Sequence, residues 1–236
     1  MKIRILAISV VALLVASCIV QQPAKGPVED YNYAISGEVK ALSTGGGVDV
    51  IVDSTLDPGR VRVRTNTDVI ECVEIYTENS TLHIKQTTCK LRPKILEVYV
   101  PAYDYESVAA SGGSDITWRG CNVPMLTVAA SGGADVDIEA NSDSITLSTS
   151  GGADVEIWGI SRQFDVSASG GSDVSAKRLI AEHVTVSASG GADVEVYASK
   201  SITMLASGGA DVSYGGNPAV KDINVSGGAD VERDDD

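Results

Sequence analysis

The hexapeptide Ser-Gly-Gly-Ala-Asp-Val at residues 131–136 (SGGADV) occurs seven times between Ser111 and Val231, with Ser for Ala and Ile for Val as its only changes. Successive copies start 20, 19, 19, 20, 18 and 19 residues apart. Spacing this regular indicates a repeat architecture, which decides the fold before any single site is considered. A degenerate eighth copy spans residues 45–50. The seven copies begin at Ser111, Ser131, Ser150, Ser169, Ser189, Ser207 and Ser226.

Apolar residues recur at alternate positions on both sides of each phrase, which is a strand signal with the apolar set on one face. The glycine pair separates the two alternating runs and permits backbone angles that a residue with a Cβ resists, so we expect a corner between two strands. Three residues before the phrases stand Val108, Val128, Leu147, Val166, Val186, Met204 and Ile223. Two residues after them stand Trp118, Ile138, Ile157, Ala176, Val196 and Tyr214.

Each repeat therefore supplies two strands of about five residues, the glycine corner and a polar turn such as 140–144 or 199–201. One repeat cannot bury its apolar face alone, so successive copies must stack as coils whose equivalent strands pair in parallel. The predicted fold is all-β, a single-stranded parallel β-helix (solenoid) with about 19 residues per coil. A propeller is the competing repeat fold, but its blades need about 40 residues.

The bulk composition limits the function. A chain of 236 residues that is 43% hydrophobic can bury a sizeable core as one domain. Its net charge is −14, and removal of Lys2 and Arg4 with a leader makes it −16. Such a chain repels nucleic acid and anionic headgroups overall and favours cations or basic partners. We therefore exclude nucleic-acid binding.

The first residues have the pattern of an export signal. Lys2 and Arg4 precede an apolar run, residues 5–16, that is too short for a membrane span. The sequence Val-Ala-Ser-Cys at residues 15–18 resembles the bacterial lipobox. That resemblance implies a signal peptide at residues 1–17, acylation of Cys18 and a membrane-anchored lipoprotein of the bacterial envelope, in the outer membrane. An ordinary secretory signal with an incidental Cys18 is the alternative.

Three further segments complete the predicted organisation. Residues 18–30 lack periodicity and predict a flexible tether. Residues 31–105 predict irregular N-terminal coils, with a hairpin turn at 78–81, that cap the regular repeats of residues 106–231. Within that cap we expect strands at 34–41, 48–52, 61–64, 72–76, 82–85 and 95–100.

The cysteines and the C-terminus each leave two interpretations open. Cys72 and Cys89 flank the predicted hairpin, so they form either a disulfide or two buried thiols, and Cys121 has no partner in either case. Residues 232–236 form an acidic tail after the last repeat. Its charges either protect an uncapped strand edge from aggregation or belong to a surface that stacks on another protein, including self-association through the C-terminal coil.

The aspartate of each phrase is the main candidate for chemistry. By parity these side chains point away from the core and stack into a ladder, in which charges about 5 Å apart repel by roughly 1 kcal/mol in water. Either hydrogen bonds from backbone N–H groups at the corner or from the neighbouring Ser offset this repulsion, which we favour, or calcium ions bridge the carboxylates. We expect no other metal or cofactor. The ladder comprises Asp115, Asp135, Asp154, Asp173, Asp193, Asp211 and Asp230, with Asp49 from the degenerate copy.

Catalysis has little support in this pattern, because the acidic position is the same in every coil and a catalytic site is a local departure from a repeat. His83 and His183 are expected to be surface residues, and no catalytic residue is predicted. Binding of a protein or glycan to a flat polar wall is harder to exclude, although Trp118 is predicted to face inward and only Trp158 outward. The wall consists of Ser107, Thr127, Thr146, Thr185 and Thr203 in one column and Ser148, Ser167 and Ser187 in another.

The repeated phrase, the lipobox and the irregular β-rich opening together resemble the head GIN domain family of auto-transporter adhesins, over about residues 31–231. The resemblance implies a right-handed parallel β-helix in an exported, envelope-associated protein, and it transfers no binding residues. Our leading hypothesis is a non-enzymatic lipoprotein whose β-helix is an adhesin-like or partner-binding scaffold. The alternative is a cation-dependent polysaccharide lyase or hydrolase of the parallel β-helix type.

Overall fold

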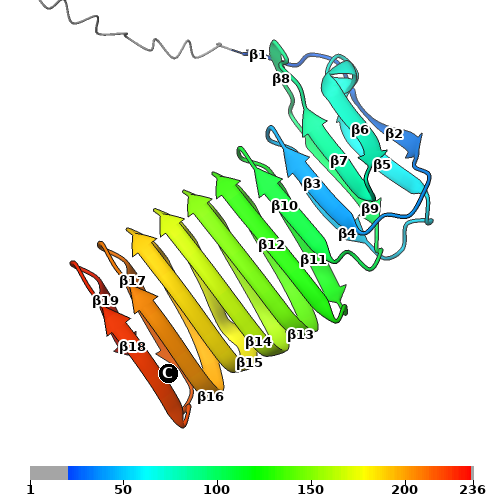
Figure 1. Ribbon diagram of the computed structural model, residues 1–236. Helices are drawn as coiled ribbons and strands as arrows, with labels where there is room; N and C mark the ends of the chain where they lie inside the picture. The colour runs from blue at the N-terminus through cyan, green and yellow to red at the C-terminus, as the bar shows by residue number, and fades with distance from the viewer. Residues whose placement is uncertain (1–20, 235–236) are drawn as a thin grey trace, which may run out of the picture.

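The computed structural model describes residues 21–234, which are built almost entirely of β-strands (Figure 1). Within this range no helix reaches the length and hydropathy that a membrane span requires. Residues 1–20, with the predicted signal peptide and Cys18, lie outside the described residues.

The first strands are β1 Gln22–Pro23, β2 Val28–Ala34, β3 Ala41–Gly45, β4 Asp49–Asp53, β5 Arg60–Asn66, β6 Val73–Glu78, β7 Thr81–Gln86, β8 Leu91–Arg92 and β9 Leu96–Pro101, with one 3-10 turn, η1, at Ile70–Cys72. The repeats form β10 Ser107–Ser111, β11 Asp115–Cys121, β12 Met125–Gly132, β13 Asp135–Gly151, β14 Asp154–Gly170, β15 Asp173–Gly190, β16 Asp193–Ala206, β17 Asp211–Gly215, β18 Val220–Val225 and β19 Asp230–Arg233.

The repeats form a parallel β-solenoid of about seven turns, as the sequence predicts. Equivalent residues of successive phrases are direct partners, for example Asp135 with Asp154 and Asp154 with Asp173. One face of the solenoid carries the strand segments before the Ser-Gly-Gly corner, and we call it the hydroxyl face. The other carries the segments that begin at the aspartate, and we call it the acidic face.

The middle coils differ from the prediction of two short strands joined by a polar turn. β13, β14 and β15 are continuous strands of 17, 17 and 18 residues that bend where a turn was expected. Residues 140–142 of β13 stay in register with residues 159–161 of β14 through the bend. Pairing with the next coil therefore continues through this bend of β13, whereas the β14–β15 and β15–β16 pairs shift register at their bends. The expected turn at 140–144 is wrong for this reason.

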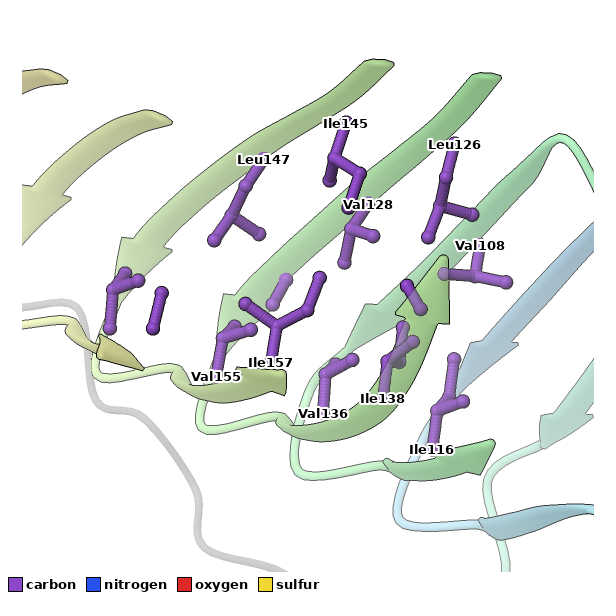
Figure 2. Close-up of a cluster of buried hydrophobic side chains, with 14 of the residues drawn as sticks. Val108, Ile116, Leu126, Val128, Val136, Ile138, Ile145, Leu147, Val155 and Ile157 are labelled. Carbon is purple, nitrogen blue, oxygen red and sulfur yellow. The ribbon is translucent and has the colours of Figure 1, made fainter. Parts of the chain in front are cut away.

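The core is a narrow column of aliphatic side chains between the two faces. Leu126, Val128 and Leu147 from one face meet Val136 and Ile157 from the other (Figure 2). All the inward positions predicted from the alternation are buried in the middle coils, and Trp118 is only 2% exposed. The alternation therefore identified the core correctly, because parallel pairing in register keeps equivalent residues on the same face.

The N-terminal cap is threaded in an order that the sequence did not predict. β3 and β4 form a coil directly beside β10 and β11, and β7 and β9 form the coil beyond it. β6 then pairs antiparallel with β7, while β5 pairs antiparallel with both β9 and β2. These antiparallel strands cover the edges at this end of the solenoid, which is how a parallel stack avoids an exposed edge.

Two strand predictions in the cap had different outcomes. The hairpin at 78–81 is confirmed, since β6 and β7 are joined by Asn79 and Ser80 at φ 50° and 58°, the left-handed angles of a two-residue hairpin turn. The predicted strand at 34–41 is wrong, because β2 ends at Ala34 and β3 begins at Ala41. Gly37 between them has φ 93°, a backbone angle that ends an extended strand.

The described part of the predicted tether belongs to the folded cap. Residues 22–23 form β1, which pairs with β8, and residues 28–30 belong to β2. Ala24 is 2% exposed and packs with Val69 and Cys89. The expectation of a tether is therefore wrong from residue 21 onward, because a lack of periodicity does not exclude short strands held by distant partners.

The C-terminal end is open. β18 pairs with β16 and β19 with β17, and no described strand lies beyond them. Ile223 and Val225, at core-facing positions, are 36% and 47% exposed. Glu232 and Arg233 belong to β19, so the predicted acidic tail begins inside a strand.

Candidate functional site

The aspartates of the repeat form a continuous ladder of carboxylates along the acidic face. Backbone pairing places each one beside the next, and the ladder continues into the cap because Asp49 pairs with both Asp115 and Glu97. Neighbouring strands lie about 4.8 Å apart, which is the spacing of the rungs. Two cap residues and seven repeat residues give nine rungs. In spatial order they are Glu97, Asp49, Asp115, Asp135, Asp154, Asp173, Asp193, Asp211 and Asp230.

The glycine pair places each aspartate at the equivalent position of its coil. The first glycine, such as Gly151, has φ 81°, and a Cβ built on it would lie 3.0 Å from backbone N and O atoms of Gly132 in the preceding coil. The second glycine, Gly152, donates its N–H to the Gly132 carbonyl at 2.7 Å. The corner thus forms its own coil-to-coil hydrogen bonds, and glycine is required where two backbones approach this closely.

The expected caps on the aspartates are largely absent. Between residues 21 and 234, only Asp115 and Asp230 of the ladder accept a backbone N–H, from Asp135 and Val231 respectively. Neither donor belongs to a glycine pair. Most rungs therefore lack such a cap, because the N–H of the second glycine donates to a glycine carbonyl of the preceding coil instead. The carboxylates from Asp135 to Asp230 are exposed to water, which solvates their charges.

The rungs nearest the cap have altered acidities. Burial raises the pKa of Asp49, and the charges of Asp115 and Glu97 raise it further. Burial also raises the pKa of Asp115, with a contribution from the charge of Asp135, while the Asp135 N–H acts in the opposite direction. Ionised carboxylates are therefore least favourable where the ladder meets the cap.

A second acidic column runs beside the ladder, and its members Asp137, Glu156 and Glu195 are paired with cations. Asp137 pairs with Arg119, and Glu156 pairs with Arg178. Lys177 lies between Glu195, at 3.5 Å, and Asp234. The ladder itself has no salt bridge among the described residues, so the two columns differ in whether their charge is neutralised. The sequence pattern did not reveal this difference, because the pairing cations lie outside the repeated phrase.

The residues flanking the second column leave no aromatic platform for a sugar. Trp158 lies outward as predicted but is half-buried, and the guanidinium groups of Arg119 and Arg178 lie over its ring at 4.2 and 4.8 Å. Stacking of this kind is an attractive cation–π contact that occupies the ring. The acidic face is therefore suited to cationic groups rather than to the apolar faces of sugar rings.

Metal and acid–base chemistry find no favourable geometry in the described residues. No group of three or more His, Cys, Asp or Glu side chains in residues 21–234 is placed to hold a metal ion. His83 is stacked on Tyr76, and His183 Nδ1 lies 2.7 Å from Ser201 Oγ. His83 lies in β7 of the cap and His183 in β15 of the repeats, and no finding favours the lyase alternative.

The hydroxyl face has the columns that the sequence predicts. Ser107, Thr127 and Thr146 are direct partners, and Asp165 continues the column between Thr146 and Thr185. Beside it, alanine and serine residues from residues 109–111, 129–131, 148–150 and 167–169 line a shallow hollow. Small side chains make the hollow, and it contains no charged group.

The open C-terminal coil contributes a second depression, which lies on the ladder itself. Five carboxylates surround it together with Val194, Val212 and Ser213. They are Asp193, Glu195, Asp211, Asp230 and Glu232. This end of the ladder therefore carries a hollow whose charged groups are all carboxylates.

The cysteines occupy two different environments. A disulfide joins Cys72 and Cys89, whose Cα atoms are 5.8 Å apart. Cys121 is a buried free thiol, and burial raises its pKa to about 12. A thiol of this kind is unreactive near neutral pH. Cys18 lies outside the described residues.

Known proteins share this fold. A family model described as "Putative auto-transporter adhesin, head GIN domain" matches residues 39–218. No curated protein sequence gives a significant match.

Three solved structures are similar over most of the chain. A putative adhesin from Bacteroides fragilis has a TM-score of 0.80 at 18% identity, and the match covers 90% of this chain and 99% of that one. A putative lipid binding protein from Parabacteroides distasonis has a TM-score of 0.70 at 15% identity, with 91% and 99% covered. A putative adhesin from Parabacteroides merdae has a TM-score of 0.68 at 17% identity, again with 91% and 99% covered. At these identities the similarity shows the fold.

Proposed function

Because the chain belongs to the head GIN domain family of auto-transporter adhesins, we propose that it is a non-enzymatic, adhesin-like scaffold of the cell envelope. Its binding surface is the acidic face, and its partner is a protein that presents lysine or arginine side chains. Membership of this family and the similarity to adhesin structures support the coarse role. The choice of surface rests on the structure of the ladder.

One observation carries this proposal: the ladder is not neutralised, whereas the acidic column beside it is. Asp137 and Glu156 each have an intramolecular cation, but the ladder rungs Asp135 and Asp154 have none among the described residues. A row of exposed, unpaired carboxylates at a fixed spacing attracts cationic side chains over its whole length. A partner with basic groups on an extended strand or a flat surface matches this spacing.

The envelope location is part of the same proposal. The Val-Ala-Ser-Cys sequence at residues 15–18 supports cleavage before Cys18 and acylation of that residue. Acyl chains then anchor the mature chain to a membrane. Mass spectrometry of the N-terminal peptide from the native host tests this directly. We expect a lipid-modified Cys18, and an unmodified peptide that starts elsewhere would contradict the anchor but not the adhesin role.

Binding is tested with the purified chain on immobilised matrix proteins, such as fibronectin and laminin, and on a glycan array. The ladder variant carries Asp135→Asn, Asp154→Asn and Asp173→Asn. A matched control carries Asp143→Asn, Asp165→Asn and Asp222→Asn, which remove the same charge from other positions. We expect salt-sensitive binding to a basic protein, weakened by about tenfold or more in the ladder variant and nearly unchanged in the control.

Two results would contradict the proposal. Equal loss in both variants would show that net charge, rather than the ladder, determines binding. Absence of binding to any protein or glycan, together with release of products from an acidic polysaccharide, would favour the enzymatic alternative.

A further inference from the structure

The folded chain begins very close to the proposed acylation site. Gln21 donates from Nε2 to the Cys89 carbonyl at 2.9 Å, and the Gln22 N–H donates to the Lys90 carbonyl at 3.0 Å. The Ala24 N–H then donates to the Arg92 carbonyl at 2.9 Å. Three peptide steps separate Cys18 from Gln21, and they span at most about 11 Å. An acyl group on Cys18 would hold this part of the cap directly at the bilayer.

This part of the cap is a small, separately packed unit. Ala24, Val69 and Cys89 are buried together, with Cys72 and Leu91 against them. The disulfide between Cys72 and Cys89 crosses the unit. The disulfide and the hydrogen bonds between segments far apart in the sequence fix the shape of this unit, and therefore its surface.

Further hydrogen bonds attach the unit to the rest of the cap. The Asp68 carboxylate accepts the N–H groups of Lys25 and Gly26 at 2.9 and 3.0 Å. Asn66 donates to the Gly26 carbonyl at 2.7 Å and accepts the Lys94 N–H at 2.8 Å. The backbone that carries the basic side chains of this unit is therefore held at several points.

The surface of this unit is basic, although the chain as a whole is strongly acidic. Lys25, Lys90, Arg92 and Lys94 are all exposed, and none of them forms a salt bridge within residues 21–234. We call these four residues the basic patch. Asp68 and Glu71 are the carboxylates of the same segment. By contrast, the cations beside the acidic ladder, Arg119, Lys177 and Arg178, are paired.

We infer that the basic patch is a docking face for an anionic lipid surface, against which the acylated N-terminus holds the cap. This inference rests on the proposed acylation of Cys18. Four cations within about a Debye length of anionic headgroups are attracted to them, and such groups add to the effect of an acyl chain. The overall negative charge opposes membrane approach, so only an orientation that presents the patch is favourable.

The orientation has a consequence for the acidic face. β1 and β8 lie at the N-terminal end of the molecule, and β18 and β19 lie at the opposite end of the solenoid (Figure 1). Docking through the patch therefore puts the open coil and its carboxylates farthest from the anionic headgroups that would repel them. The same arrangement leaves that end accessible to a partner.

Lysine footprinting of the acylated full chain in vesicles tests the inference. The chain is reconstituted in phosphatidylcholine vesicles with and without phosphatidylglycerol, and in detergent micelles, then labelled with an amine-reactive ester. We expect the reactivity of Lys25, Lys90 and Lys94 to fall several-fold in the anionic vesicles and to recover in about 1 M salt. Lys200 and Lys221, in the repeat coils, are internal controls that should not change.

Two footprinting results would overturn the inference. Patch lysines that remain as reactive as Lys221 in anionic vesicles would show that the patch does not face the bilayer. Equal protection in vesicles without phosphatidylglycerol would show that the anchor alone, and not charge, brings the cap to the surface.

The patch is also tested without the anchor, so that a failure of acylation does not affect the result. A chain that begins at residue 19 is sedimented with phosphatidylglycerol vesicles, and Lys90→Gln, Arg92→Gln and Lys94→Gln are compared with the control changes Arg162→Gln, Lys200→Gln and Lys221→Gln. Binding should fall about fivefold per patch residue, and by about a hundredfold for all three. Equal losses in the control would overturn the inference. A failure to find any adhesin partner would leave both measurements unaffected.

Discussion

Single residues at the corner determine how closely the coils stack. From Gly132 onward, the first glycine of each pair has a left-handed φ and a Cβ on it would lie within about 3.0 Å of the backbone of the preceding coil, whereas the second has no left-handed φ and more room. A Cβ on Gly151 would meet Gly132 at 3.0 Å, but a Cβ on Gly152 would lie 3.6 Å from the nearest atom, the Gly132 carbonyl oxygen. The two glycines of one phrase are thus required to different degrees.

This difference predicts unequal costs for one substitution. Gly151→Ala should lower the free energy of unfolding by more than about 2 kcal/mol, because it adds both left-handed strain and a backbone contact. Gly152→Ala should change it by less than about 1 kcal/mol. Urea denaturation of the two variants makes the comparison. Equal effects would show that close approach of the backbones is not what selects glycine here.

The acidity of Asp115 gives a prediction for pH. Its pKa is raised in the folded chain, chiefly by burial, so its protonation favours folding. The stability that it contributes is fully present below its unfolded pKa of about 3.9 and is lost as the pH rises through the raised folded value. Asp115→Asn should therefore raise the melting temperature at pH 7 and give no advantage near pH 3.5. A gain of the same size at both pH values would contradict the assignment.

At the level of the element, the ladder is a strand feature that no single rung explains. Each interior carboxylate has two like-charged neighbours about 4.8 Å away, and water rather than a hydrogen-bonded corner stabilises most of them. The repulsion between neighbouring carboxylates therefore persists along the acidic face. That is the physical reason to regard the ladder as a surface for an external cation-bearing partner.

Removal of one interior charge should therefore stabilise the fold. Asp154→Asn should raise the free energy of unfolding by about 1 kcal/mol at low salt, because it removes two repulsions of roughly that size that solvent partly screens. The gain should disappear near 1 M salt, where the Debye length is about 3 Å. Glu156→Gln is the control and should instead be neutral or destabilising, since Glu156 pairs with Arg178. A destabilising Asp154→Asn would instead support a structural role for the ladder.

The ladder should not depend on calcium for stability. No described group of acidic side chains is arranged to hold a metal ion. We therefore expect thermal melts with millimolar calcium and with chelator to coincide. Occupation of a site at 100 times its dissociation constant would add about 2.7 kcal/mol, which shifts the melting temperature of a chain this size by several degrees. Such a shift, with binding heat in a calorimetric titration, would make the ladder a metal column.

At the scale of the whole molecule, sequence periodicity predicted the regular part well and the ends poorly. The spacing of the phrase and the alternation around it determine register, core and ladder, because parallel coils repeat the same environment. The cap depends on long-range pairings, such as β2 with β5 and β1 with β8, that leave no periodic signal. Glu97 joined the ladder, and the patch residues came together, only through those pairings. The cations that pair the second acidic column were missed because they lie outside the repeated phrase.

The two ends of the molecule differ in one more respect. The N-terminal end is sealed by antiparallel strands, whereas the last coil presents the same kind of edge that every earlier coil presents to its successor. Duplication of one phrase and its flanking strands would bury the present edge and create an equivalent new one. Length could thus change in steps of about 4.8 Å per coil without any adjustment of the cap. Gain or loss of a coil by genetic duplication or deletion would therefore change the length of the solenoid, and with it the distance between the N-terminal cap and the open C-terminal coil.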